Sequence, residues 1–70
     1  MQKNILSLIG NNIRKVRKEK NISQEELANK ANLHRTYIGM IERAEKNITI
    51  LNLQKIAKAL NIEISCLLKK

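Results

Sequence analysis

The 70-residue chain contains no proline, tryptophan or phenylalanine, and its only aromatic residue is Tyr37. Unpaired bases stack on aromatic side chains, so a single tyrosine excludes a stacking platform for single-stranded nucleic acid. The two glycines, Gly10 and Gly39, lie far apart in the sequence and cannot form a glycine-rich loop that cradles phosphates. The sequence therefore predicts neither of these two kinds of site.

Cysteine and histidine are equally scarce. Cys66 has no partner for an internal disulfide, which is typical of proteins in the reducing cytoplasm. His34 is the only histidine, so the chain has no paired cysteine or histidine spacing for a zinc ion. With one His, one Cys and one Tyr, no catalytic constellation emerges. We expect neither an enzyme nor a bound metal, cofactor or small-molecule ligand.

Long hydrophobic runs are also missing, whereas positive charge is in excess. No run approaches the roughly 18 apolar residues of a membrane span. The apolar cluster at residues 5–9 is interrupted by Ser7 and lacks a cleavage-like ending, so it does not indicate a signal peptide. Lys and Arg number 14 against 6 acidic residues, a net charge of +8. This charge favours an anionic partner but does not by itself distinguish a nucleic-acid binder from a basic interaction domain.

Polar breaks and helical periodicity predict a single, compact, all-α domain over residues 1–70. The breaks divide the chain into about five helical pieces. They lie at Asn21, Asn32, Asn47 and Asn61. A chain of this length buries only about 60% of its unfolded surface, so self-association is expected to add stability.

The first helix is predicted over about residues 3–19, because apolar side chains recur on one face with the helical period. This stripe consists of Ile5, Ile9, Ile13 and Val16. Gly10 lies inside the helix and costs about 1 kcal/mol relative to alanine, so we expect less rigid first turns.

Residues 23–43 predict two short helices joined by a tight turn. Ser23 and Glu26 are spaced as a capping box, in which each side chain satisfies a free backbone N–H of the first turn. Asn32 follows the first of these helices, where a left-handed conformation is needed. The second helix begins near residue 34. Its inward residues are Ile38 and Ile41, and its outward residues are Arg35, Thr36, Gly39 and Met40.

The remaining sequence predicts two more helical pieces. The fourth has Thr49 as its N-cap and Asn61 as its left-handed C-terminal cap. Its buried stripe is Leu53, Ile56, Ala57 and Leu60. The last piece, about residues 63–69, carries more apolar side chains than its few neighbours can bury, which predicts a two-fold contact between copies of the chain. The residues expected at this dimer contact are Ile64, Leu67 and Leu68.

Residues 13–60 resemble the Cro/CI-type (XRE-like) helix-turn-helix family of phage repressors and bacterial regulators. The resemblance rests on the motifs SQEELA, LHRTYIGMIER, KNIT and NLQKIAKAL, which occur in the family order. Together these motifs are most similar to the controller proteins of restriction-modification systems. The resemblance implies a five-helix, lambda-repressor-like domain that binds a double-stranded DNA operator as a homodimer. Residues 35–43 would form the recognition helix, with its N-terminal residues against base edges in the major groove.

The resemblance also implies roles for individual residues. Arg35 would be the main base reader, because its fork fits guanine O6 and N7. The implied base contacts are Arg35, Thr36, Tyr37, Met40 and Lys46. The implied phosphate contacts are Gln24, Arg43, Asn47 and Asn52. Arg17 and Glu42 match a buried salt bridge of the family, so Arg17 is not counted as a DNA contact.

Three residues depart from the family pattern. His34 stands where an acidic cap is usual, and Met40 replaces a small residue. Ala44 stands where Gly or Asn usually ends the helix, at a cost of about 1–2 kcal/mol unless the helix ends later. A phage-type repressor, an antitoxin-type autoregulator and a helical protein-interaction domain without DNA binding are the alternatives. The sequence leaves RNA polymerase open as a further partner.

Overall fold

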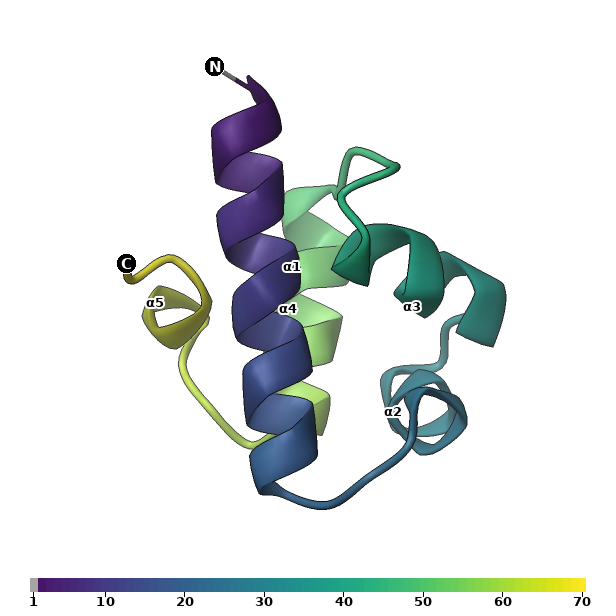
Figure 1. Ribbon diagram of the computed structural model, residues 1–70. Coiled ribbons are helices and arrows are strands. Elements are labelled where there is room, and N and C mark those ends of the chain that lie inside the picture. The colour runs from purple at the N-terminus through teal and green to yellow at the C-terminus, as the bar shows by residue number, and fades with distance from the viewer. Residues whose placement is uncertain (1) are drawn as a thin grey trace.

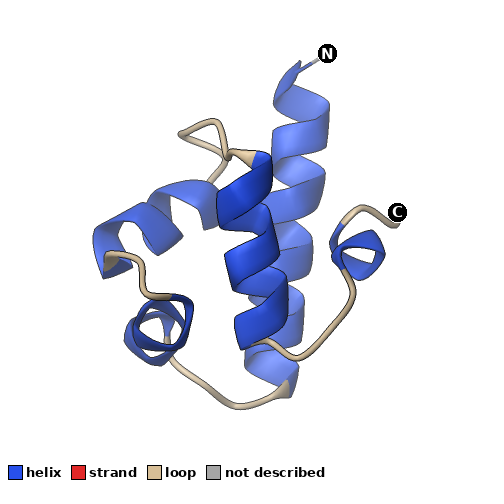
Figure 2. Ribbon diagram, turned by 180° about the vertical axis from the view of Figure 1, so that it is seen from behind, coloured by secondary structure: helices blue, strands red, loops and turns tan. Residues whose placement is uncertain are grey.

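The computed structural model describes residues 2–70, and their side chains from Ile5 onward. The helices are α1 (Gln2–Glu19), α2 (Gln24–Ala31), α3 (Arg35–Glu42), α4 (Ile50–Ala59) and α5 (Ile64–Leu67). Within the described part, only helices and loops are present (Figure 2), and the prediction of an all-α, five-helix domain is confirmed. Long α1 runs along the molecule, with α3 on one side and α5 on the other (Figure 1). None of these helices combines the length and the apolar character needed to cross a membrane.

The core is formed by one apolar face from each helix. Its buried members are Ile9, Ile13, Leu27, Ala28, Ala31, Ile38, Ile41, Leu53, Ile56, Ala57, Leu60 and Leu67. The predicted α1 stripe is correct for Ile9 and Ile13, but wrong for Ile5, which is 51% exposed. The 18 residues of α1 span about 27 Å, and its first turn extends beyond the shorter helices in Figure 1. Ile5 therefore has too few neighbours to be buried.

Four helix ends use the same backbone turn, in which one residue adopts a left-handed conformation. These residues are Asn21 (φ 61°), Asn32 (φ 58°), Ala44 (φ 60°) and Asn61 (φ 59°). At each one, the next residue donates its N–H to the carbonyl five residues earlier, as in Glu45 N to Met40 O at 2.8 Å. This is the Schellman motif. The predicted caps at Asn32 and Asn61 are confirmed. The alternative that α3 ends later is not observed, because α3 ends at Glu42. Ala44 therefore occupies the left-handed position, which is strained for alanine.

Gly10 has a role that periodicity did not reveal. A Cβ at this position would lie 2.5 Å from the carbonyl oxygen of Ile41 and 2.8 Å from that of Glu42. Both contacts are with backbone, which cannot move away as a flexible side chain can. Gly10 thus permits the close crossing of α1 over the C-terminal end of α3. We expected this glycine to make the first turns of α1 less rigid, but its role in the fold is to allow this packing.

α5 has four residues and is shorter than the predicted piece at residues 63–69. Leu67 is fully buried in the core of its own protomer, so the prediction that it contacts a second copy is wrong. The amide nitrogen of Asn12 on α1 donates to the carbonyl oxygens of Leu67 at 2.9 Å and Lys69 at 2.7 Å. These bonds satisfy carbonyl groups at the end of α5. They hold the C-terminal segment against α1.

Candidate nucleic-acid interface

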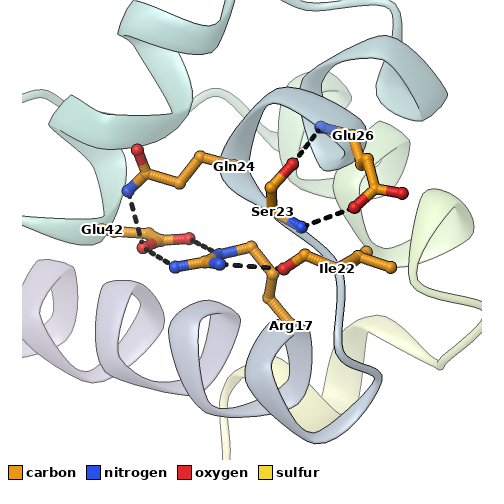
Figure 3. A network of polar contacts seen from close by, with 6 residues as sticks. All are labelled: Arg17, Ile22, Ser23, Gln24, Glu26 and Glu42. Atoms are coloured by element: carbon orange, nitrogen blue, oxygen red, sulfur yellow. Dashed lines mark hydrogen bonds and ion pairs between the residues drawn. The ribbon is translucent and has the colours of Figure 1, made fainter.

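The N-terminus of α2 has the local structure that its sequence predicts. Ser23 Oγ accepts a hydrogen bond from Glu26 N at 3.0 Å, and Glu26 Oε1 accepts one from Ser23 N at 2.9 Å (Figure 3). The two bonds form a complete capping box. They fix where α2 begins, and therefore where its first backbone N–H groups lie relative to α3.

A buried ion pair connects α1 to the end of α3. Arg17 Nε donates to Glu42 Oε2 at 2.7 Å, and Arg17 Nη2 donates to Glu42 Oε1 at 3.1 Å. The two side chains are only 10% and 4% exposed. Arg17 Nη1 also donates to the Ile22 carbonyl at 2.9 Å, so the guanidinium spans three segments (Figure 3). The structure thus contains the scaffold pair that the family resemblance implied.

Gln24 joins this network from α2. Its amide nitrogen donates to Glu42 Oε1 at 3.0 Å, across from Arg17 (Figure 3). The Glu42 carboxylate therefore accepts three hydrogen bonds, two of them from a cation, which compensates the cost of burying its charge. The side chain of Gln24 is turned toward the scaffold, and the first turn of α2 is anchored directly to α3.

α3 begins at an unexpected cap. His34 has an extended backbone, and its Nδ1 accepts a hydrogen bond from Thr36 N at 3.2 Å. An unprotonated ring nitrogen can accept this bond, so the imidazole takes the place of the usual Ser, Thr, Asp or Asn oxygen. His34 departs from the acidic residue that is usual at this position of the family, but it still caps α3. The side chains of Arg35 and Thr36 follow this cap and are exposed.

A shallow, open hollow lies between the start of α2 and the outer face of α3. Gln24, Arg35, Thr36 and Arg43 are among its lining residues. Gly39, expected to face outward, is buried at this hollow, where a Cβ would lie 3.0 Å from Nη1 of Arg43. The arginine lies across the helix because this position has no side chain. The hollow thus brings Arg35, a predicted base contact, and Arg43, a predicted phosphate contact, to the same surface.

Arg43 is paired with a residue that the sequence did not single out. Its Nε lies 3.0 Å from Glu45 Oε2, and both side chains are more than half exposed. Glu45 accepts a hydrogen bond from the guanidinium and raises the pKa of Arg43 above its ordinary value. The two residues flank Ala44, and no periodicity or cap pattern marks them as a pair. Glu45 places a negative charge beside a predicted phosphate contact.

Tyr37 and Asn52 are also in direct contact. Asn52 Nδ2 donates to the phenolic oxygen of Tyr37 at 3.0 Å, joining α3 to the first turn of α4. Tyr37 is half-buried and packs against the core. Lys46 and Asn47 are exposed in the connection between α3 and α4, and Met40 is half-buried on α3. From the sequence, Tyr37 and Asn52 were predicted as separate DNA contacts, and the hydrogen bond between them was not predicted.

The described residues include no cluster of three or more His, Cys, Asp or Glu side chains that could hold a metal ion.

Residues 13–65 match the helix-turn-helix family HTH_3. The chain is 46% identical over 66 residues to Control protein C.SmaI from Serratia marcescens, covering 94% of this chain and 79% of that protein. The structure of the restriction-modification controller protein C.AhdI from Aeromonas hydrophila is 40% identical, with a TM-score of 0.87 over 89% of this chain and 94% of that one. The structure of C.Esp1396I bound to a 25 base pair operator site is 47% identical, with a TM-score of 0.80 over 84% of this chain and 78% of that one. With the capped α2–α3 pair and the Arg17–Glu42 bridge in place, the chain belongs to the Cro/CI-type helix-turn-helix family, and restriction-modification controller proteins are among its relatives.

Proposed function

We propose that this protein is a sequence-specific, double-stranded DNA-binding transcriptional regulator that acts as a homodimer on a pseudo-palindromic operator. The observation that carries the proposal is that α3 is attached to α1 and α2 on one side and exposed on the other. Its inner face is fixed to α1 and α2 through Glu42, while Arg35 and Thr36 remain exposed beside the start of α2. A helix mounted in this way can enter a major groove as one rigid piece with its support. It acts by binding, in the cytoplasm, and not by catalysis.

Base recognition is proposed for the outer face of α3. Arg35 is the main reader, because its guanidinium fits the two acceptors of guanine. Thr36 supplies a hydroxyl beside it. The further proposed base contacts are Tyr37, Met40 and Lys46. Met40 is half-buried, so only part of its side chain is available to a thymine methyl group.

Phosphate contacts are proposed on either side of this face. Gln24 lies at the start of α2, where free backbone N–H groups favour an anion. Arg43 and Asn47 lie at the other end of α3 and are exposed. Asn52 lies in the first turn of α4. Such contacts set the position and orientation of the protein on the duplex, whereas the base contacts set its sequence preference.

The homodimer is proposed from the size of the protomer, whose extents are 30 × 21 × 20 Å. Two recognition helices must lie about 34–36 Å apart to enter successive major grooves, so each half-site needs its own protomer. Ile64 and Leu68 remain the proposed contact at α5, where Leu68 is 43% exposed. Ile50 and Leu51 at the start of α4 are 74% and 61% exposed and form a second candidate contact.

Sedimentation equilibrium of single lysine variants locates the dimer contact. Leu68→Lys is expected to dissociate the dimer if α5 forms the contact, and Ile50→Lys or Leu51→Lys if α4 forms it. A charge placed in an apolar contact leaves an unpaired ion on association. A chain that stays monomeric at the concentrations where it binds operator DNA would contradict the homodimer.

DNA recognition is tested with Arg35→Ala and a matched control. The variant is expected to lose about 1–3 kcal/mol of operator binding and to tolerate changes at one base pair, because a bidentate base contact is removed. Arg14→Ala removes the same charge from an exposed position on α1 and should keep the sequence preference. Fluorescence anisotropy on operator duplexes found by footprinting the upstream DNA measures both. Wild-type affinity must also fall steeply with salt if several phosphates are contacted.

The regulatory circuit proposed is that of a restriction-modification controller. The dimer would activate its own promoter and a linked endonuclease gene at a strong site, and repress them when a second dimer fills a weaker site. RNA polymerase would then be a partner during activation. Methyltransferase and endonuclease genes beside this gene would support the circuit, whereas their absence would favour a phage-type repressor or an antitoxin-type autoregulator.

A protein-interaction domain is the second candidate function, and the exposed Ile50 and Leu51 pair favours it. Adjacent exposed aliphatic side chains are typical of a contact surface. This candidate predicts that Arg35→Ala leaves function intact. The DNA-binding proposal predicts its loss, so the same variant separates the two.

A further inference from the structure

We propose that Asn52 is a positioning residue for Tyr37, and that the Tyr37 hydroxyl donates its proton to a phosphate oxygen of the operator. This inference rests on the DNA-binding function proposed above. It deepens that proposal, because it replaces two separate contacts, Tyr37 to a base and Asn52 to a phosphate, with one unit.

The direction of the hydrogen bond carries the first step. The amide nitrogen of Asn52 lies 3.0 Å from the phenolic oxygen of Tyr37. An amide nitrogen has only N–H donors, so the phenolic oxygen is the acceptor in this bond. The O–H of Tyr37 is not used by Asn52, and it stays available as a donor. The N–H of Asn52 thereby occupies one side of the phenolic oxygen. The O–H of Tyr37 is directed away from the Asn52 amide.

Both Asn52 and Tyr37 are supported by other parts of the protein, so the pair is preorganised. Thr49 Oγ accepts a hydrogen bond from the backbone N–H of Asn52 at 3.1 Å, which fixes the first turn of α4. The ring of Tyr37 is half-buried and packs against the core, which fixes the phenolic oxygen. Little side-chain freedom is left to lose when the hydroxyl meets its acceptor, and this raises the contribution of the contact to affinity.

The location of the pair favours a phosphate over a base. The hollow beside α2 is lined by Arg35 and Thr36, whereas the hydroxyl of Tyr37 meets the first turn of α4. Lys46 and Asn47 are exposed in the connection that joins α3 to α4. A cation and polar side chains at this connection suit the sugar-phosphate backbone. Tyr37 therefore fixes the register of α3 on the duplex, and Arg35 and Thr36 remain the base readers.

A double-mutant cycle tests the unit. Tyr37→Phe keeps the ring and removes the hydroxyl, and Asn52→Ala removes the amide. Each is expected to weaken operator binding by about 3- to 10-fold, the range of one hydrogen bond. The double variant should be no weaker than Tyr37→Phe alone, because Asn52 acts through the hydroxyl. Gln54→Ala, on an exposed part of α4, is the matched control and should bind as the wild type does.

A second measurement detects the phosphate itself. Single phosphates of the operator are replaced by neutral methylphosphonates, one position at a time. One position should weaken wild-type binding but have no effect on Tyr37→Phe or on Asn52→Ala. A simple loss of folding would lower binding at every position equally. Asn52→Leu, which keeps a helix-forming side chain of similar size, should repeat the Asn52→Ala result, and thermal unfolding checks each variant.

Three results would overturn the inference. Additive losses would show that Asn52 contacts DNA independently. No loss in Tyr37→Phe would show that the hydroxyl of Tyr37 does not contact a phosphate. Loss of the methylphosphonate effect in Tyr37→Phe alone would show that Asn52 does not position the hydroxyl. A wild-type protein that fails to bind the operator would overturn the proposed function as well, whereas these three results leave it standing.

Discussion

The inner side of α3 and the connection that follows α3 differ in how they are held. On the inner side, Gly10 brings α1 into backbone contact and Arg17 pairs with Glu42 out of solvent. In the connection, residues 43–49, the Arg43 side chain is paired in solvent and Ala44 adopts a left-handed conformation. Close packing and a buried ion pair stabilise the inner side of α3. The connection instead has a solvent-exposed ion pair and contains a strained residue. The difference predicts that substitutions on the two sides affect different properties.

The largest effect is expected from Glu42→Ala. Removing one partner of a buried ion pair leaves the Arg17 guanidinium buried without a counter-charge and costs about 3–5 kcal/mol. This is a large part of the stability of a domain of this size. Urea unfolding followed by circular dichroism measures the loss. Glu19→Ala on an exposed position of α1 is the control, and a Glu42→Ala protein as stable as that control would refute the structural role of the pair.

Two glycine substitutions should have opposite effects. Gly10→Ala places a Cβ against the carbonyl groups of α3, and overpacking of this kind costs about 1–3 kcal/mol. The Cβ of Gly39→Ala meets the tip of the Arg43 side chain, which can move, and lies at an ordinary contact distance from the Gln24 side chain. The gain in helix propensity of up to about 1 kcal/mol should therefore dominate. Thermal unfolding compares the two directly. Equal effects would mean that the α1–α3 crossing can open without cost.

The strained turn after α3 should be improved by Ala44→Asn. Asparagine accepts the left-handed conformation more readily than alanine, and the expected gain is about 1 kcal/mol. Asn61→Ala creates the same strain at the end of α4 and should lose a similar amount. The midpoints of chemical unfolding give both values. If Ala44→Asn brings no gain, the turn relaxes in solution to a conformation without the strain.

The smallest effect on stability is expected from Glu45→Gln, because its partner Arg43 is exposed and water screens their attraction. The effect should appear in DNA binding. Loss of the carboxylate frees the guanidinium for a phosphate and removes a repulsive charge, so affinity should rise. The slope of log K against log salt should steepen by up to about 0.9, the contribution of one phosphate contact. An unchanged slope would mean that the pair with Glu45 does not limit the contact of Arg43 with the DNA backbone.

The predictions that the structure confirms depend on neighbours in the sequence. The capping box needs only Ser23 and Glu26, three residues apart, and the turn after α2 needs only Asn32. Apolar periodicity identified most of the core for the same reason. It placed Ile5 in that core, because periodicity states which face of a helix is apolar, not how far the neighbouring helices extend.

The features that sequence reasoning missed join distant segments. Asn12 bonds to carbonyl groups 55 and 57 residues away, and this contact holds the C-terminal segment against α1. Leu67 was expected at a dimer contact, but the same docking buries it in its own protomer. The bond between Asn52 and Tyr37 crosses from α4 to α3. No local pattern contains information about such pairs.

The sequence alone thus determined the order of the helices, most of their caps and the family resemblance, because propensity, periodicity and capping act over three to five residues. Tertiary structure decided what those elements do together. It assigned Gly10 to a helix crossing, turned Gln24 toward Glu42 and made Asn52 a partner of Tyr37. These assignments depend on how close two helices approach and on which donor meets which acceptor, and both are set only when the chain has folded.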